Sequence, residues 1–309
     1  MTADARRLLS RCATGAWLSV HVFYYDAQDD LLLDCIRPLA ATLRDDGVID
    51  GFFFLRYFEE GPHVRVRTRV PDDASADAAA ARIDSALHEF LTQRPSRGRL
   101  ESNVDGPRNA DNTFDYRLYE PEVDRYGGPA GLAVAEEHFE LSSDVALDLI
   151  ARTRGDRERR LTFALRALLT AGVAFGLDGD ELARFMTVYA RAALRGTAMS
   201  DGGVAGALEQ FERGYERLAP ALRALAVGLL EQSDPSDPIG RWRAGMTAAA
   251  RRLRQAEAAG LLTGDRGVER FLSSYLHLLN NRLGLPYSTE AYLAFLAARL
   301  LADMEPVNA

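Results

Sequence analysis

The stretch FFFLRYFEEGPHVRVRTR, residues 52–69, has the pattern of two β-strands joined by a turn. Aromatic residues dominate its first half, valine and arginine alternate in its second half, and EEGP between them is a turn signal. Successive side chains of a strand point to opposite faces, so His63, Arg65, Arg67 and Arg69 share one face. We therefore expect a β-hairpin whose second strand carries a row of cations.

The row of arginines has two interpretations. It can be a solvent-exposed arginine-rich edge, or a surface that binds anions, because a guanidinium holds a carboxylate by two parallel hydrogen bonds. We favour the anion-binding surface, since like charges two residues apart repel and no carboxylate alternates with them. The chain contains no lysine, so all 37 basic residues are arginine, and a Schiff-base lysine or a P-loop lysine is excluded.

Outward from the hairpin, the patterns predict an α+β protein. AWLSVHVFYY, residues 16–25, is typical of a strand, the segment after it has helical spacing up to Gly47, and an alanine-rich helix is expected over Ser75–Gln93. Beyond about residue 130, helical periodicity broken at five loop-like stretches predicts about six helices. We expect one domain over residues 1–309, in which a mixed strand and helix portion, 1–129, packs on a helical bundle, 130–309.

Composition excludes several classes of function. The net charge of −8 and the pI of about 5.3 argue against direct binding of nucleic acid. No apolar run approaches the length of a membrane span, and the N-terminus lacks the apolar core of a signal peptide, so a cytoplasmic protein is expected. Cys12 and Cys35 stand apart without a histidine cluster, which indicates neither a metal site nor a disulfide framework.

A second motif, YRLYEPEVDRYGG at residues 116–128, places Glu122 and Arg125 three positions apart ahead of two glycines. If EPEVDRY forms a helical turn, the two side chains share a face. A surface ion pair of this kind contributes only about 0.2 to 1 kcal/mol to stability. The glycines either bring the backbone close to a ligand or turn the chain into the next helix, so taken alone the motif favours a structural role.

A third motif, FLSSYLHLLNNRLGLP at residues 271–286, is typical of a helix that ends near Gly284. Spacings of four place Ser273, His277 and Asn281 in one polar row. The packing stripe is expected at Leu272, Leu276, Leu279 and Leu283. A lone histidine on a helix is usually structural, but the polar row within an apolar bundle makes His277 a candidate acid or base.

Taken in order, the three motifs resemble the C-terminal elimination domain of class I lantibiotic dehydratases, from near Trp17 to near Leu301. Stand-alone forms of that domain accompany thiopeptide and other bacteriocin-type pathways. The resemblance implies removal of glutamate from a serine or threonine of a ribosomally made precursor peptide, after a separate tRNA-dependent subunit has glutamylated it. The product would be dehydroalanine or dehydrobutyrine.

The resemblance also implies roles for single residues. The positions that the family's pattern makes catalytic are Arg65, Arg67, Glu122, Arg125 and His277. Those expected to help bind the substrate are Arg56, His63, Arg69, Tyr126 and Asn281. Neither a metal nor a cofactor is implied. One reaction at these positions requires residues more than 200 positions apart to converge on one cavity.

Two other functions fit the same motifs. One is the formal [4+2] cycloaddition of two dehydroalanines by which pyridine synthases of thiopeptide pathways form their ring, and the other is non-catalytic binding of a precursor peptide as a scaffold. Retention of the arginine and histidine motifs favours elimination. The expected partners are the precursor peptide and the glutamylating subunit, without nucleic acid or membrane, and homodimer formation is left open.

Overall fold

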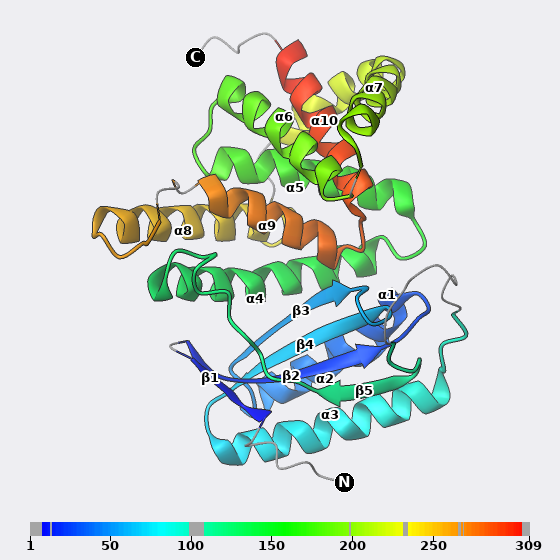
Figure 1. Ribbon diagram of the computed structural model, residues 1–309, viewed down its shortest axis with the longest axis vertical. Coiled ribbons are helices and arrows are strands. Elements are labelled where there is room, and N and C mark those ends of the chain that lie inside the picture. The colour runs from blue at the N-terminus through cyan, green and yellow to red at the C-terminus, as the bar shows by residue number, and fades with distance from the viewer. Residues whose placement is uncertain are drawn as a thin grey trace. The chain divides into compact units, whose positions relative to one another are not determined.

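The structure is a computed structural model, and it describes residues 8–12, 14–98, 108–197, 199–230, 234–264, 267 and 269–304. The chain divides into two compact units (Figure 1). The first comprises Met1–Arg154 and Gly260–Gly264, and the second comprises Gly155–Ala259 and Asp265–Ala309.

The first unit is built on an antiparallel sheet of five strands in the order β1-β2-β4-β3, with β5 paired to β2. The strands are β1 (Ser10–Cys12), β2 (Gly15–Phe23), β3 (Gly51–Tyr57), β4 (His63–Val70) and β5 (Thr113–Tyr116). β3 and β4 form the predicted hairpin, and β2 is the strand predicted over residues 16–25. The arginine-bearing strand β4 is therefore central, with β2 and β3 on either side.

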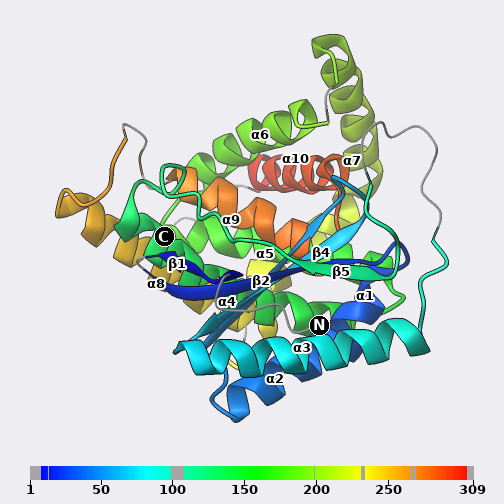
Figure 2. The same cartoon turned by 60° about the horizontal axis from the view of Figure 1, so that its bottom comes forward.

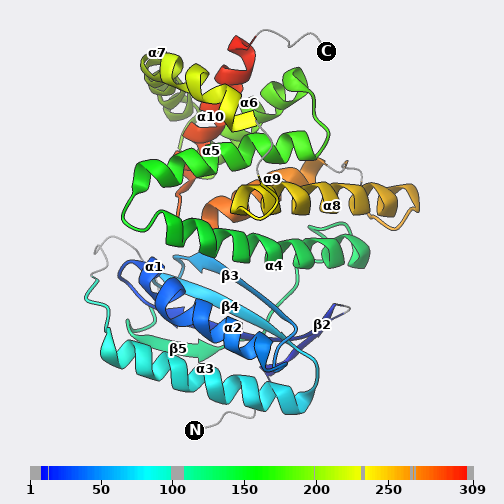
Figure 3. The ribbon, with the colours of Figure 1, turned by 180° about the vertical axis from the view of Figure 1, so that it is seen from behind.

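Helices cover one face of this sheet. They are α1 (Gln28–Leu31), the π-helix η2 (Leu32–Ile36), α2 (Arg37–Asp45) and α3 (Asp73–Gln93), and α2 and α3 lie side by side (Figures 2 and 3). The sheet residues Val20, Phe52 and Val66 are buried against them, and each is less than 4% exposed. This layer removes the apolar side of β4 from water, which is the main stabilising contribution in such a fold.

The long helix α4 (Pro129–Arg152) belongs to the first unit because it packs along β3. The backbone N–H of Phe54 in β3 donates to the hydroxyl of Ser143 in α4 at 3.2 Å. The rings of Phe53 and Phe139 pack with their centres 5.5 Å apart. The long helix α4 thus packs with the sheet, and the predicted division of the chain at residue 130 stays a prediction.

Among the described residues of the second unit, every regular element is a helix. Its helices are α5 (Arg157–Ala174), α6 (Gly179–Arg195), α7 (Asp201–Leu230), α8 (Pro238–Ala258), α9 (Glu269–Arg282) and α10 (Tyr287–Asp303), and α6 packs against α10 (Figure 1). Trp242 is fully buried, and its indole N–H donates to the carbonyl of Ala167 at 3.0 Å. Among the described residues, no helix is both long and apolar enough to cross a membrane.

The predicted class, α+β with a helical C-terminal portion, is confirmed. The number of helices differs from the prediction, because seven follow residue 128 in the described part of the chain. The additional break lies between α4 and α5, where Gly155 has a φ of +73° and the carboxylate of Asp156 accepts from the backbone N–H of Arg159. A left-handed glycine followed by an N-cap is a common way to end one helix and start another.

Candidate active site

The predicted alternation along β4 is confirmed. Val64 and Val66 are buried on the face that α2 and α3 cover, and Arg65, Arg67 and Arg69 alternate with them, so they lie on the opposite face. The register pairs the three arginines with β2 and β3 residues that share this face: Trp17, Ser19 and His21 on one side and Gly51, Phe53 and Leu55 on the other. We call this surface the arginine face.

Arg69, at one end of the row, is paired with carboxylates. Its guanidinium donates to Asp50 and to Glu140 of α4, each at 2.7 Å. Burial raises the pKa of Glu140 to about 7, and Arg69 opposes that rise. Arg69 thus links β4 to the neighbouring turn and to α4, and these contacts satisfy its charge. Its predicted contact with substrate stays a prediction.

Arg67 differs, because no carboxylate in the described part of the chain forms an ion pair with it. Its guanidinium carbon lies 4.3 Å from the ring centre of Tyr119 and 5.2 Å from that of Phe53. Burial lowers the pKa of Arg67, and its Nε is buried without a hydrogen-bond partner among the described residues. Aromatic faces stabilise a cation while leaving its N–H edge available, which suits a site for an anion.

Arg65 is oriented by a buried histidine. Its guanidinium lies over the ring of Tyr57, 3.4 Å from the ring centre, and its Nε–H donates to Nε2 of His63 at 3.0 Å. Because Nε2 accepts, the proton of neutral His63 is on Nδ1, which donates to the carbonyl of Gly61 at 2.8 Å. His63 is only 1% exposed, and burial lowers its pKa. The structure therefore shows His63 in contact with Arg65, and its predicted contact with substrate stays a prediction.

The second motif forms the expected turn. Arg125 donates to both carboxylate oxygens of Glu122, at 3.0 and 3.2 Å, so the two side chains share a face as predicted. Gly127 and Gly128 have φ values of +69° and +94°, which favour glycine, and lead the chain into α4. Glu122 also acts on Arg67, where its charge partly offsets the lowering of the pKa by burial.

Arg65, Arg67, Glu122 and Arg125 thus belong to one electrostatic network within the first unit. Burial opposes the charge of Arg125, but the neighbouring Tyr126 and the bond to Glu122 raise its pKa overall. Two further candidates of this unit are more deeply buried. Arg56 is on the helix-covered face, 7% exposed and ion-paired with Asp29 at 2.7 Å, and Tyr126 is 2% exposed.

His277 lies on α9 in the second unit, and the predicted faces of this helix are confirmed. Ser273, His277 and Asn281 are partly exposed. The four leucines of the packing stripe, Leu272, Leu276, Leu279 and Leu283, are fully buried. Since His277 and the arginine face belong to different units, their convergence on one cavity stays a prediction.

Two residues of α10 contact His277 and were not among the predicted site residues. Glu290 lies 3.0 and 3.3 Å from the imidazole Nδ1 through its two oxygens, and it is 1% exposed. The hydroxyl of Tyr287 is 3.2 Å from Nε2, and its ring stacks on the imidazole with the centres 4.7 Å apart. A carboxylate in the first turn of the next helix was the only sequence signal for this arrangement.

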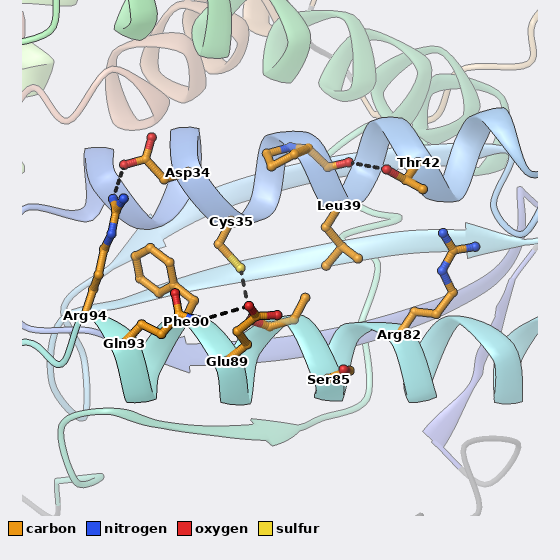
Figure 4. Close-up of a pocket in the computed structure, with 12 residues that line it drawn as sticks. Asp34, Cys35, Leu39, Thr42, Arg82, Ser85, Glu89, Phe90, Gln93 and Arg94 are labelled. Carbon is orange, nitrogen blue, oxygen red and sulfur yellow. Dashed lines mark hydrogen bonds and ion pairs between the residues drawn. The ribbon is translucent and has the colours of Figure 1, made fainter.

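A separate groove lies on the helix-covered side of the first unit, between α2 and α3 (Figure 4). It has a volume of about 490 Å³, and none of the predicted site residues line it. Cys35 of the π-helix η2 is its potential nucleophile, but burial raises the pKa of this thiol to about 12. A thiol that keeps its proton is a poor nucleophile. We therefore keep the arginine face, and not this groove, as the candidate active site.

Comparison with known proteins agrees with the three motifs. A family model for the lantibiotic biosynthesis dehydratase C-terminal region matches residues 17–301. The nisin biosynthesis protein NisB of Lactococcus lactis subsp. lactis is 28% identical over 144 residues, which are 45% of this chain and 12% of that protein. The epidermin biosynthesis protein EpiB of Staphylococcus epidermidis is 24% identical over 137 residues, 43% of this chain and 12% of that protein.

Solved structures share the fold. The pyridine synthase TbtD from thiomuracin biosynthesis superposes with a TM-score of 0.75 at 19% identity, covering 93% of this chain and 98% of that one. The tRNA-dependent lantibiotic dehydratase MibB from Microbispora sp. 107891 gives 0.63 at 21% identity, covering 95% of this chain and 28% of that one. The resemblance read from the sequence is confirmed, and the chain belongs to the family of lantibiotic biosynthesis dehydratase C-terminal domains.

Proposed function

We propose that this protein eliminates glutamate from glutamylated serine and threonine residues of a ribosomally made precursor peptide, leaving dehydroalanine or dehydrobutyrine. One observation carries the proposal. Arg65 and Arg67 are adjacent cations on the arginine face for which the described residues provide no carboxylate ion pair, whereas Arg69 on the same strand has two. A substrate with a free carboxylate and a second carboxylate that forms during the reaction needs such a pair of cations.

The steps of the elimination indicate a role for each group of the candidate site. A base removes the α-proton of the glutamylated residue, the C–H electron pair forms the Cα=Cβ bond, and the Cβ–O bond breaks to release glutamate. The leaving group is a carboxylate, whose conjugate acid has a pKa of about 4, so the ester leaves far more readily than a hydroxyl would. In this proposal the arginines hold the glutamyl group and stabilise its developing charge, and His277 transfers a proton.

The substrate of this reaction must first be made by an enzyme of another class. Esterification of a serine hydroxyl requires an activated glutamate, and glutamyl-tRNA is the donor that the resemblance implies. We propose that a tRNA-dependent glutamylating enzyme is the partner of this protein, and that the precursor peptide passes from one to the other.

A synthetic core peptide with one serine esterified by glutamate tests the proposal. We expect the mass of the peptide to fall by one glutamic acid, with dehydroalanine at that serine, while the same peptide with an unmodified serine stays unchanged. Joining of two dehydroalanines into a ring, in a peptide that carries them, without loss of glutamate from the esterified peptide would show cycloaddition instead. Binding without any change in mass would show a scaffold, and either result would overturn the proposal.

A further inference from the structure

We infer that Glu290 is a positioning residue that fixes the orientation and the tautomer of His277. Its carboxylate lies 3.0 Å from Nδ1 of the imidazole and is 1% exposed, whereas His277 itself is partly exposed. A buried carboxylate that holds one nitrogen of a more accessible histidine is a recurrent arrangement for proton transfer. The part of this inference that concerns the reaction rests on the proposed function.

Glu290 is itself held in place. The hydroxyl of Tyr189, on α6, donates to Oε1 of Glu290, and Tyr189 is 6% exposed. Burial, and then the charge of Glu290, raises the pKa of Tyr189 well above its ordinary value. The phenol therefore keeps its proton and remains a donor to the carboxylate. One oxygen of Glu290 is thus bound by α6, and both oxygens lie within reach of His277.

The start of α10 supplies both partners of the imidazole. Pro286 precedes the helix, Tyr287 is its first residue, and Glu290 lies in its first turn, where the unpaired backbone N–H groups favour a negative charge. Tyr287 and Glu290 lie on one turn of the helix, and between them they contact both ring nitrogens of His277. This geometry is fixed by backbone structure, which side chains on a loop would not achieve.

The chemistry of the partners determines the tautomer. A carboxylate only accepts hydrogen bonds, so Nδ1 of His277 must carry a proton. In the neutral ring Nε2 then has a free electron pair, to which the hydroxyl of Tyr287 donates at 3.2 Å. Nε2 is therefore the atom that would accept or return a proton during elimination. Without the carboxylate, the proton would be free to move to Nε2. In Ser-His-Asp triads, replacement of the aspartate by asparagine keeps the geometry but gives the histidine the wrong tautomer.

The tautomer can be measured without any assumption about the reaction. Nitrogen-15 NMR of histidine-labelled protein at pH 8.5 distinguishes protonated from unprotonated ring nitrogens, and the signals of His277 are assigned by their loss in His277→Asn. We expect a protonated Nδ1 in the parent protein and a shift of the proton toward Nε2 in Glu290→Gln. The matched control, Glu269→Gln, alters an exposed carboxylate on the same helix as His277 and should leave the pattern unchanged. An unprotonated Nδ1 in the parent, or the same pattern in Glu290→Gln, would overturn the inference.

The second measurement is single-turnover elimination with the glutamylated peptide. Glu290→Gln should slow the chemical step by about 10²-fold while the Kd of the peptide stays within about twofold, because the substitution changes the base and not the binding groups. An unchanged rate in a folded variant would exclude a positioning role in the reaction. If the parent protein itself releases no glutamate, the proposed function fails, and the NMR experiment still decides how Glu290 acts on His277.

Discussion

At the scale of the single residue, Arg67 is a half-buried cation near the rings of Tyr119 and Phe53, and its Nε is buried without a hydrogen-bond partner among the described residues. Arg67→Lys keeps the positive charge but loses the planar fork that binds a carboxylate by two hydrogen bonds, and it weakens the stacking. We expect single-turnover elimination to slow by about 10² to 10³-fold, the scale on which loss of one preorganised donor acts.

Arg44→Lys is the matched control for this substitution. Arg44 is also partly buried, it lies over the ring of Phe52 at 5.6 Å, and it pairs with Asp144 of α4. It belongs to the helix-covered side of the first unit, so its replacement should leave the rate of elimination unchanged. Equal rates for Arg67→Lys, Arg44→Lys and the parent protein would show that Arg67 does not hold the substrate.

At the scale of the element, the turn that carries Glu122 and Arg125 packs directly on the start of α4. A Cβ atom at Gly131 would lie 1.8 Å from the carbonyl oxygen of Tyr126, a distance at which the backbone must move. We expect Gly131→Ala to destabilise the protein by about 1 to 3 kcal/mol through this overpacking. It should also slow elimination, because the turn shifts, and urea unfolding together with single-turnover kinetics measures both effects.

Gly206→Ala is the matched control for Gly131→Ala, because we do not expect it to destabilise the protein. Gly206 lies inside α7, where a Cβ atom would meet no neighbouring group within 4 Å, and alanine favours a helix by about 1 kcal/mol over glycine. This variant should be equally or more stable than the parent, with an unchanged rate of elimination. A Gly131→Ala variant as stable as Gly206→Ala would show that the turn adapts freely.

Elements with a strong local pattern could be predicted from the sequence. The hairpin depends on period-two alternation and a turn signal, and the faces of α9 depend on helical spacing, so both follow from neighbouring residues. The break between α4 and α5 also has a local signal, which the prediction did not use: the polar run RTRGDRERR, residues 152–160, interrupts the apolar spacing and places Gly155 directly before the N-cap Asp156.

Contacts between elements were not predictable for a different reason. The pairing of Arg69 with Glu140 requires α4 to lie along β3, and the contact of His277 with Glu290 depends on how α9 and α10 pack after the turn between them. Neither distance is encoded in sequence spacing. The candidate residues themselves could be chosen from their motifs, whereas their partners required the structure.

At the scale of the whole molecule, the buried histidines of the arginine face couple stability to pH. Burial lowers the pKa of His21 from 6.5 to about 2. Between these values the unfolded chain binds the proton and the folded chain does not, so stability is fully present above pH 6.5 and is lost as the pH falls. A single histidine with this shift should cost about 2 kcal/mol between pH 7 and pH 5.

His21→Gln isolates this contribution, because other groups titrate in the same range, and Glu140 with its raised pKa acts in the opposite direction. We expect the free energy of unfolding in urea to fall by about 2 kcal/mol less in His21→Gln than in the parent protein between pH 7 and pH 5. The control His88→Gln removes an exposed histidine and should keep the slope of the parent. A parent-like slope in His21→Gln would contradict the prediction.

Each compact unit contains one of the two tryptophans of the chain, Trp17 in the first and Trp242 in the second, and both are fully buried. Each unit therefore has its own intrinsic fluorophore, and no added label is needed. In Trp17→Phe the remaining emission comes from the helical unit, and in Trp242→Phe it comes from the unit that carries the arginine face. The intact protein thus has two independent optical reporters, and comparing their unfolding midpoints shows directly whether the two units lose their structure in one cooperative step or in two.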